Sequence, residues 1–169
     1  IIIGADSDLT KKTMKEIYRP INRKHNKKIF MSVESAELTK YAANSFLATK
    51  ISFMNEISSL AQNSGGNMHE IKEGLGSDSR IGPSFLNAGL GFGGSCFPKD
   101  LKAIIHEQKK RNLHQGIVFS ALNINKKQID LFYKKILNFY NGKINDKSFL
   151  IWGIAVKQNP DNIRATVSI

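Results

Sequence analysis

The sequence predicts a mainly α-helical protein with a short α/β segment at each end. A long proline-free run at residues 34–63 places apolar side chains at helical spacings. A second periodic stretch covers residues 116–140. Only three short apolar or β-branched runs, at residues 1–3, 28–33 and 149–156, indicate strands. Helices therefore account for most of the expected structure.

The two ends of the chain have the pattern of incomplete α/β units. At the first end, strands are expected at residues 1–3 and 28–33, around a helix at residues 9–18. This order is typical of the last edge of a larger sheet. At the other end, residues 149–156 predict a buried strand, with a further helix starting near Ala165. The chain also starts without a methionine, so we expect it to be part of a longer protein.

The middle of the chain predicts a series of helices. The helix at residues 34–63 has apolar residues on so much of its surface that we expect it to be buried against more than one neighbour. A short helix is expected at residues 68–74, with Gly76 stopping it. Further helices are expected at residues 100–111 and 116–140.

The composition is typical of a soluble globular protein, because 41% of the 169 residues are hydrophobic and 23% are charged. No apolar run is long enough to span a bilayer and no signal peptide precedes Ile1, so we expect a cytoplasmic protein with no membrane partner. The single cysteine excludes an internal disulfide and a cysteine-based metal cluster. The four histidines show no ligand spacing, so no metal site is expected.

The formal net charge of +11 suggests nucleic-acid binding as an alternative. The lysines, however, occur in small groups along the chain, without the interleaved aromatic residues of a single-strand binder. They are typical of solvated helix faces, so we expect no nucleic-acid partner. The excess of positive charge suits an anionic small molecule such as a nucleotide diphosphate.

A glycine-rich stretch at residues 89–100 (GLGFGGSCFPKD) contains the only cysteine and predicts a functional site. Its glycines let the backbone approach a ligand and donate amide hydrogen bonds. Pro98 fits the first turn of a helix, which places Cys96 at or just before the helix N-terminus. The helix dipole, with Lys99 and Lys102, favours a reactive thiolate there. Asp100 falls on the same side of the first turn and can handle a proton or orient a water.

The same stretch contains a literal G-x-G-x-x-G at Gly89, Gly91 and Gly94. A dinucleotide-binding fingerprint follows a strand, and an acidic residue that binds the ribose lies about twenty positions later. Residues 83–88 make a poor strand, and Glu107 lies inside an expected helix. The fingerprint is therefore rejected.

Lys40 and Asn44 lie four residues apart on the expected helix at residues 34–63, so both head groups can reach one ligand. The spacing alone is a weak signal, because a lysine on a helix is usually solvated.

Three groups of residues, in order, resemble the UDP-glucose/GDP-mannose dehydrogenase family. They are AELTKYAAN followed by FLA at residues 36–48, SRIG at residues 79–82, and FLNAG running into the glycine-rich stretch at residues 85–100. The form GGSCFPKD is more similar to the UDP-glucose 6-dehydrogenases than to relatives that act on GDP-mannose or N-acetylated sugars.

The resemblance implies a domain organisation. Residues 1–33 correspond to the edge of an N-terminal NAD-binding Rossmann domain, residues 34–145 to a helical central domain that forms a homodimer through its long helix, and residues 146–169 to the start of a C-terminal nucleotide-sugar-binding domain. On this basis the chain is mainly α, flanked by truncated edges of two Rossmann-like domains, and by itself is expected to be inactive.

The resemblance also implies a reaction. The C6 alcohol of UDP-glucose is oxidised to a carboxylate by two NAD and water, through an aldehyde and a thioester. Cys96 matches the nucleophile of the family. Lys40 and Asn44 match the pair that stabilises oxyanion charge and orders water. Asp100 matches the carboxylate that assists proton transfer and thioester hydrolysis.

Further positions match binding residues of the family. Arg80 matches an arginine that reaches the partner subunit's site, and Lys157 matches a substrate-binding lysine. Val156 and residues 158–162, on either side of Lys157, depart from the family's pattern. The remaining substrate-binding matches are Phe85, Leu86, Asn87, Ala88, Gly89, Leu90, Gly91, Phe92, Gly93 and Gly94, and those near NAD are Cys96, Phe97, Pro98, Lys99 and Arg164.

Two alternatives stay open at this point. Within the same chemistry, the chain can belong to a dehydrogenase of another nucleotide sugar, of the UDP-N-acetylmannosamine or GDP-mannose type. From another class, it can be a non-catalytic basic helical module. The motifs favour the UDP-glucose enzyme.

Overall fold

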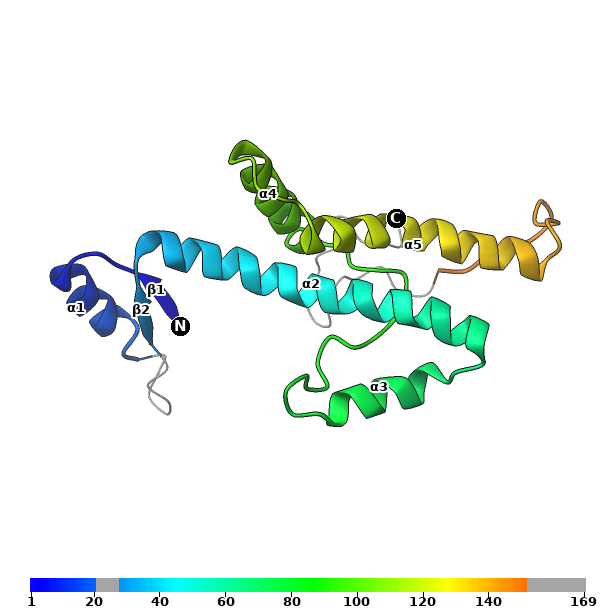
Figure 1. Ribbon diagram of the computed structural model, residues 1–169, viewed down its shortest axis with the longest axis horizontal. Helices are drawn as coiled ribbons and strands as arrows, with labels where there is room; N and C mark the ends of the chain where they lie inside the picture. Colours follow the sequence, from blue (N-terminus) through cyan, green and yellow to red (C-terminus); the bar gives the residue numbers. More distant parts are fainter. Residues whose placement is uncertain (21–27, 152–169) are drawn as a thin grey trace. The chain divides into compact units, whose positions relative to one another are not determined.

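The computed structural model describes residues 1–20 and 28–151 (Figure 1). Within these residues the chain has five helices and two short strands, so the predicted mainly α fold is confirmed. Contacts divide the chain into a unit at Ile1–Ala43 and a second unit that begins at Asn44. The boundary lies inside the longest helix.

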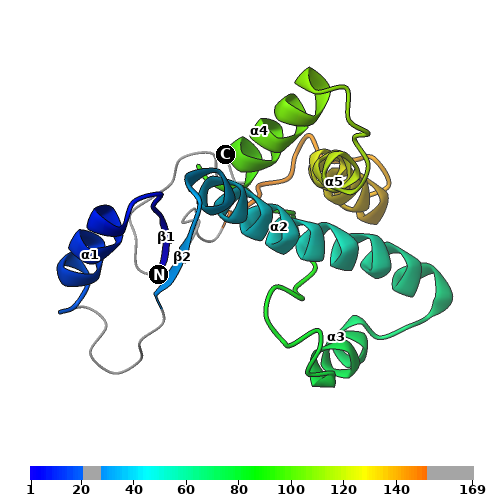
Figure 2. The ribbon, with the colours of Figure 1, turned by 60° about the vertical axis from the view of Figure 1, so that its left-hand side comes forward.

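The first unit contains a parallel pair of strands joined through a helix. Strand β1 (Ile2–Gly4) pairs with β2 (Ile29–Met31), and Ile3 lies opposite Phe30. Helix α1 (Asp8–Ile17) lies between them in sequence, as Figure 2 shows. Parallel strands need such a crossover connection, so the predicted strand–helix–strand order is confirmed. A Cβ on Gly4 would collide with the backbone of Val33, so only glycine fits at this end of β1.

Helix α2 (Val33–Ser64) is the long helix that the sequence predicts. In the second unit its buried positions carry mostly small or polar residues such as Ala48, Ser52 and Asn55, with Met54 as the one large apolar side chain among them. This chain alone does not provide the expected burial against more than one neighbour, because Phe46, Phe53 and Leu60 are 68%, 49% and 64% exposed. Close packing of neighbouring backbone selects small residues on the buried face, which leaves the large apolar ones outside.

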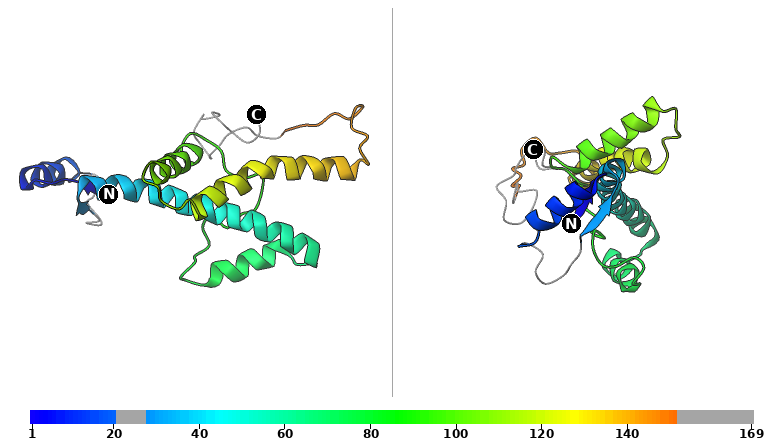
Figure 3. Two further views of the ribbon diagram at one scale, coloured as in Figure 1. Left: turned by 45° about the horizontal axis from the view of Figure 1, so that its top comes forward. Right: turned by 90° about the vertical axis from the view of Figure 1, so that its left-hand side faces the viewer.

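Three further helices follow in the second unit, and Figure 3 shows them from two more sides: α3 (Met68–Ser77), α4 (Phe97–Lys110) and α5 (Ile117–Phe139). Helix α3 continues past Gly74 and includes Gly76, which the sequence predicted as its stop. A helical glycine costs only about 1 kcal/mol relative to alanine. Gly76 also lies against Pro83, where a Cβ would be 3.2 Å from the proline Cα, so packing selects glycine inside this helix.

The core of the second unit is small and lies where α2, α4 and α5 meet. Ala48, Phe92, Leu101 and Leu122 form its buried cluster. The buried hydroxyl of Ser52 donates to the carbonyl oxygen of Ala121 at 2.7 Å, which ties α2 to α5. Phe92 comes from the segment between α3 and α4, so residues of all three helices hold this segment in place.

The C-terminal strand is predicted at residues 149–156. Residues 149–151 form no strand, and the rest of that prediction, with the helix near Ala165, lies outside the described residues. A strand needs a neighbour to satisfy its hydrogen bonds, and the two strands among residues 1–20 and 28–151 pair only with each other. In the same part of the chain, no helix is long and apolar enough to cross a membrane.

Candidate functional site

The glycine loop, defined here as residues 89–94, leads directly into α4. Gly91 and Gly94 have φ of 100° and 79°, a region that favours glycine. Residues 83–88, directly before the loop, form no strand, whereas a dinucleotide-binding fingerprint follows one. The loop instead positions the start of α4.

Cys96 is the N-cap residue of α4, as the sequence predicts. Its side chain is exposed, and its Sγ lies 3.8 Å from the Ser95 hydroxyl. No side chain caps the helix, and Pro98 occupies the first turn. The first backbone amides of α4 therefore lie beside the thiol, where the positive end of the helix dipole favours an anion.

Asp100 lies one turn into α4 and is completely buried. The Asn44 Nδ2 donates to its Oδ2 at 2.6 Å, and the Lys99 ammonium is 3.5 Å from its Oδ1. The Asp100 amide donates to the Cys96 carbonyl oxygen at 2.9 Å. The structure thus brings together three of the four predicted catalytic residues, on α2 and at the start of α4.

Lys40, the fourth, lies one turn before Asn44 on α2, in the part of the helix that belongs to the first unit. Its ammonium is 5.7 Å from the ring centroid of Tyr41. Its approach to the residues of the second unit stays a prediction.

Three aromatic rings surround the loop-to-helix junction. Phe97 makes edge-to-face contacts with Phe92 and Phe85, at centroid distances of 5.7 and 6.2 Å. Phe85 has a φ of 63°, which is unusual for a bulky residue and persists only where the surroundings enforce it. The two predicted substrate-binding phenylalanines therefore pack on the residue next to Cys96.

A cavity of about 440 Å³ lies beside the loop. Its volume is within the range of small-molecule sites. Five of its lining residues are among the predicted substrate-binding positions. The lining consists of Ile51, Ser84, Phe85, Asn87, Ala88, Gly89 and Gly91.

Two asparagines that the sequence analysis did not single out hold the glycine loop. The Asn55 Oδ1 on α2 accepts from the Gly89 amide at 2.7 Å, and Asn125 on α5 bonds both backbone groups of Phe92. Asn125 sits among apolar residues of helical period, at Ala121, Leu122 and Ile129, whereas Asn55 has serines at Ser52, Ser58 and Ser59 and gives no such signal. A polar amide in an apolar helical stripe was the available signal, and it marks a side chain that must satisfy a buried backbone group.

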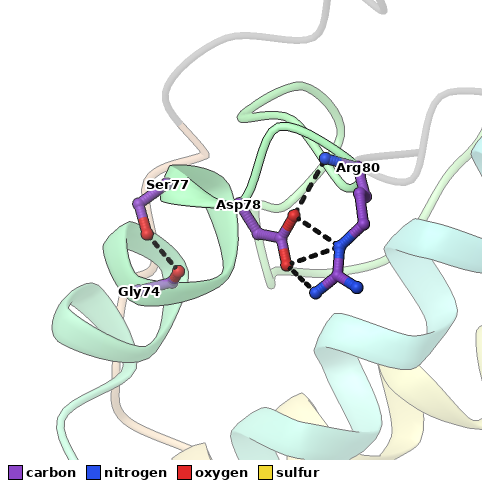
Figure 4. A network of polar contacts seen from close by, with 4 residues as sticks. All are labelled: Gly74, Ser77, Asp78 and Arg80. Atoms are coloured by element: carbon purple, nitrogen blue, oxygen red, sulfur yellow. Dashed lines mark hydrogen bonds and ion pairs between the residues drawn. The ribbon is translucent and has the colours of Figure 1, made fainter.

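Arg80 belongs to a tight turn, named here the Arg80 turn (residues 78–82), that follows α3. The amides of Ile81 and Gly82 both donate to the Asp78 carbonyl oxygen at 2.9 Å. The Arg80 guanidinium donates to both carboxylate oxygens of Asp78, with Nη2 at 2.6 Å from Oδ2 (Figure 4). These hydrogen bonds lower the pKa of Asp78 below its ordinary value and raise the pKa of Arg80.

The Arg80 turn is also fixed from outside. The Lys50 ammonium, on α2, donates to the Ile81 carbonyl oxygen at 3.0 Å. The Arg80 side chain itself remains exposed, so it is available to a ligand or a second chain. The other predicted binding residues, Lys157 and Arg164, lie outside the described residues, and in the part of the chain the structure describes no group of acidic, histidine or cysteine side chains can hold a metal ion.

The sequence of this chain is similar to those of known dehydrogenases. The chain is 37% identical over 169 residues to UDP-glucose 6-dehydrogenase of Pseudomonas aeruginosa and 38% identical over 170 residues to a UDP-glucose 6-dehydrogenase of Bacillus subtilis. All of this chain is covered, but only 37% and 38% of those proteins. The chain therefore spans less than two fifths of the length of these curated relatives.

Solved structures give the same result. A UDP-glucose dehydrogenase from Pyrobaculum islandicum matches 84% of this chain and 32% of its own, with a TM-score of 0.77 and 37% identity. A UDP-N-acetylmannosamine dehydrogenase from Pyrococcus horikoshii matches 99% of this chain and 39% of its own, with a TM-score of 0.82. At 24% identity, this match supports the fold alone. The family described as UDP-glucose/GDP-mannose dehydrogenase, central domain, matches residues 34–127. The chain therefore belongs to the UDP-glucose/GDP-mannose dehydrogenase family.

Proposed function

We propose that this chain is the central segment of an NAD-dependent UDP-glucose 6-dehydrogenase. In this proposal residues 1–33 end the NAD-binding domain, residues 34–145 form the helical dimerisation domain, and residues 146–169 begin the nucleotide-sugar domain. The observation that carries the proposal is the placement of exposed Cys96 at the start of α4, one turn from buried Asp100, which holds Asn44. That grouping lies inside the residues that match the family.

Cys96 acts as the nucleophile. After the first oxidation converts the C6 alcohol to an aldehyde, the thiolate adds to the aldehyde carbon and forms a hemithioacetal. Loss of a hydride from that carbon gives a thioester, and water then releases the carboxylate and regenerates the thiol. The exposed thiol, beside the first amides of α4, suits this role.

Asp100 and Asn44 serve the proton and water steps. A buried carboxylate one helical turn from the thiol can accept a proton from the attacking water. The hydrogen bond from Asn44 fixes the orientation of that carboxylate. Lys40, one turn earlier on α2, supplies positive charge for the developing oxyanion.

NAD accepts the two hydrides when it is bound, and most of its binding site belongs to the preceding domain. The residues of this chain fit a smaller part of the NAD-binding site. The uncapped start of α4 and the Lys99 side chain offer donors and positive charge to an anionic group. We assign Cys96, Phe97, Pro98 and Lys99, together with Arg164, to the cofactor side of the site.

UDP-glucose binds along the loop at residues 85–94. The cavity beside it supports this placement, because Phe85, Asn87 and Gly91 line it. Lys157 contributes from the next domain, and Arg80 reaches the site of a partner subunit. The net charge of +11 favours an anionic substrate over nucleic acid.

The protein forms a homodimer through α2. Phe46, Phe53 and Leu60 are exposed at seven-residue spacing, so they lie on one side of the helix. A continuous apolar stripe of this kind is typical of a helix that packs on a partner. The exposed thiol of Cys96 also suits the reducing cytoplasm, where we place the protein.

The test is a panel of nucleotide sugars given to the full-length protein with NAD. We expect NADH to form with UDP-glucose at a kcat/KM at least about 100-fold above that for UDP-N-acetylmannosamine or GDP-mannose, because a site built for one hydroxyl rejects its analogues. Oxidation of another sugar instead would identify the second dehydrogenase type. A folded protein inactive on the whole panel would contradict the enzyme proposal.

A further inference from the structure

The Asn125 side chain holds one residue of the glycine loop by two hydrogen bonds. Its Oδ1 accepts from the Phe92 amide at 2.7 Å, and its Nδ2 donates to the Phe92 carbonyl oxygen at 2.9 Å. Both functions of the side-chain amide are therefore used on a single backbone residue, as in the pairing of two strands. A shift of the loop by one residue would break both bonds, so the clamp fixes the register of the loop against α5.

Gly91 makes this clamp possible. Its φ of 100° is strained for any residue with a side chain, and a Cβ at this position would overlap the Asn125 Oδ1. Glycine is therefore required both by the backbone conformation and by the close approach of Asn125.

The clamp is connected to the start of α4 through packed rings. Phe92 is 5% exposed and belongs to the core with Leu101 and Leu122. Its ring contacts Phe97 edge-to-face, and Phe97 directly follows Cys96. Close-packed side chains transmit a displacement, so a movement of Phe92 moves the helix end that carries the thiol.

We propose that Asn125 is a positioning residue that sets the place of Cys96 for the reaction. It bonds the loop backbone alone and acts through Phe92 and Phe97. The inference rests on the proposed function in one respect, the assignment of Cys96 as the nucleophile. Asn55 differs from Asn125 because it accepts a single bond, from Gly89 at the far end of the loop.

The test uses Asn125→Ala and Asn125→Asp in the full-length protein, with Asn138→Asp as control. Asn138 is an exposed asparagine on the same helix, so the control makes the same change of charge while both Asn125 bonds to Phe92 remain. We expect kcat to fall about 100-fold in Asn125→Ala while the KM for UDP-glucose stays within about threefold, because misplacing a reacting group by about 1 Å costs this much. The control should keep its kcat.

Two readouts separate positioning from loss of folded protein. Rates are expressed per Cys96 thiol of folded protein, with the folded fraction taken from thermal unfolding. In addition, the rate at which iodoacetamide alkylates Cys96 should differ at least about threefold between Asn125→Ala and wild type, because the surroundings of the thiol change with its position. Unchanged kcat per thiol and an unchanged alkylation rate would overturn the proposal.

In Asn125→Asp, protonation of the new carboxyl group should restore the hydrogen bond to the Phe92 carbonyl oxygen. A protonated carboxyl can donate to the Phe92 carbonyl oxygen as Nδ2 does, whereas a carboxylate cannot donate and is repelled. The kcat relative to wild type at the same pH should therefore fall as the pH rises, and the same ratio for Asn125→Ala should be flat. Lys126 and Lys127, the ionisable residues that follow on α5, are exposed and the same in every variant. A flat ratio for Asn125→Asp would count against the clamp.

Gly91→Ala completes a double-mutant cycle. If Gly91 and Asn125 act through one contact, Gly91→Ala combined with Asn125→Ala should be no more than about threefold slower than the slower single variant. Multiplicative effects would contradict a shared contact. Should the wild-type protein oxidise no nucleotide sugar, the proposed function fails, while the alkylation rates still decide whether Asn125 sets the place of Cys96.

Discussion

The glycine loop and the Arg80 turn both carry residues proposed to bind the nucleotide sugar, but they are held in different ways. The glycine loop is fixed by residues far away in sequence, Asn55 and Asn125, through bonds to Gly89 and Phe92. Arg80 is held by Asp78, two residues away, on the surface. One region therefore depends on the tertiary fold, and the other largely on its own turn.

The two ways of holding a residue suit two different tasks. A nucleophile needs a fixed position, and Cys96 sits at the end of a loop that α2 and α5 both restrain. A residue that reaches another subunit needs freedom, and the Arg80 side chain is 87% exposed. The following predictions test this contrast.

The largest effect is expected from Cys96→Ser. Activity of the full-length protein should fall on the order of 10⁴-fold, because a serine hydroxyl without an adjacent base is a poor nucleophile. The melting temperature should stay the same, since the side chain is exposed and supports none of the loop contacts. The checks are NADH formation and thermal unfolding, and residual activity above about a tenth of wild type would remove Cys96 from the chemistry.

The two aspartates give the next comparison. Asp100→Ala should cost about 2–3 kcal/mol of unfolding free energy, because it leaves the donor of Asn44 without its buried acceptor. Asp78→Ala should cost much less unfolding free energy, since the Arg80 side of its ion pair is exposed to solvent. Urea unfolding of both variants measures this. Equal losses would mean that the two regions are held alike.

Lys50→Met tests the long-range hydrogen bond from α2 to the Arg80 turn. The ammonium bond to the Ile81 carbonyl oxygen is lost, while the bonds between Arg80 and Asp78 remain. We expect the KM for UDP-glucose to rise about fivefold, equivalent to one hydrogen bond, with kcat unchanged. A fall in kcat without a change in KM would link the turn to the chemistry instead. Lys72→Met, a change of the same type on α3, is the matched control.

The smallest effect concerns pH. Arg80 holds the pKa of Asp78 below its ordinary value of 3.8, so the carboxylate stays ionised in the folded state where the unfolded chain already binds a proton. The ion pair therefore contributes fully above the ordinary value and is lost as the pH falls through the lowered pKa. Carboxyl carbon shifts should show Asp78 titrating at a higher pH in Arg80→Gln than in wild type, and an unchanged midpoint would contradict the pairing.

The helices and the place of Cys96 were predictable because local signals specify them. Periodicity located α2 and α5, and the Pro98 signal placed Cys96 at a helix start. The clamp of Asn125 was not predictable, because it depends on a backbone group 33 residues away in sequence. The length of α3 was missed because Gly76 stops a helix in isolation, whereas here it packs against Pro83.

The exposure of Phe46 and Phe53 was missed for a related reason. Apolar periodicity indicates that a helix face is covered, but it does not say whether the cover comes from the same chain. Small residues such as Ser52 and Ala48 mark the face that packs inside this chain. Small or polar side chains, together with Met54, occupy the buried face of α2, whereas Phe46 and Phe53 lie exposed.

The most direct test of the central claim is the number of NADH molecules formed for each UDP-glucose consumed by the full-length protein. The account predicts two, because the alcohol is oxidised to a carboxylate through an intermediate held on Cys96. Cys96→Ser should lower the rate of NADH formation, and any carboxylate product that it still forms should be the same as that of the wild-type protein. One NADH per UDP-glucose, with the aldehyde as the product of the wild-type protein, would contradict a covalent role for Cys96.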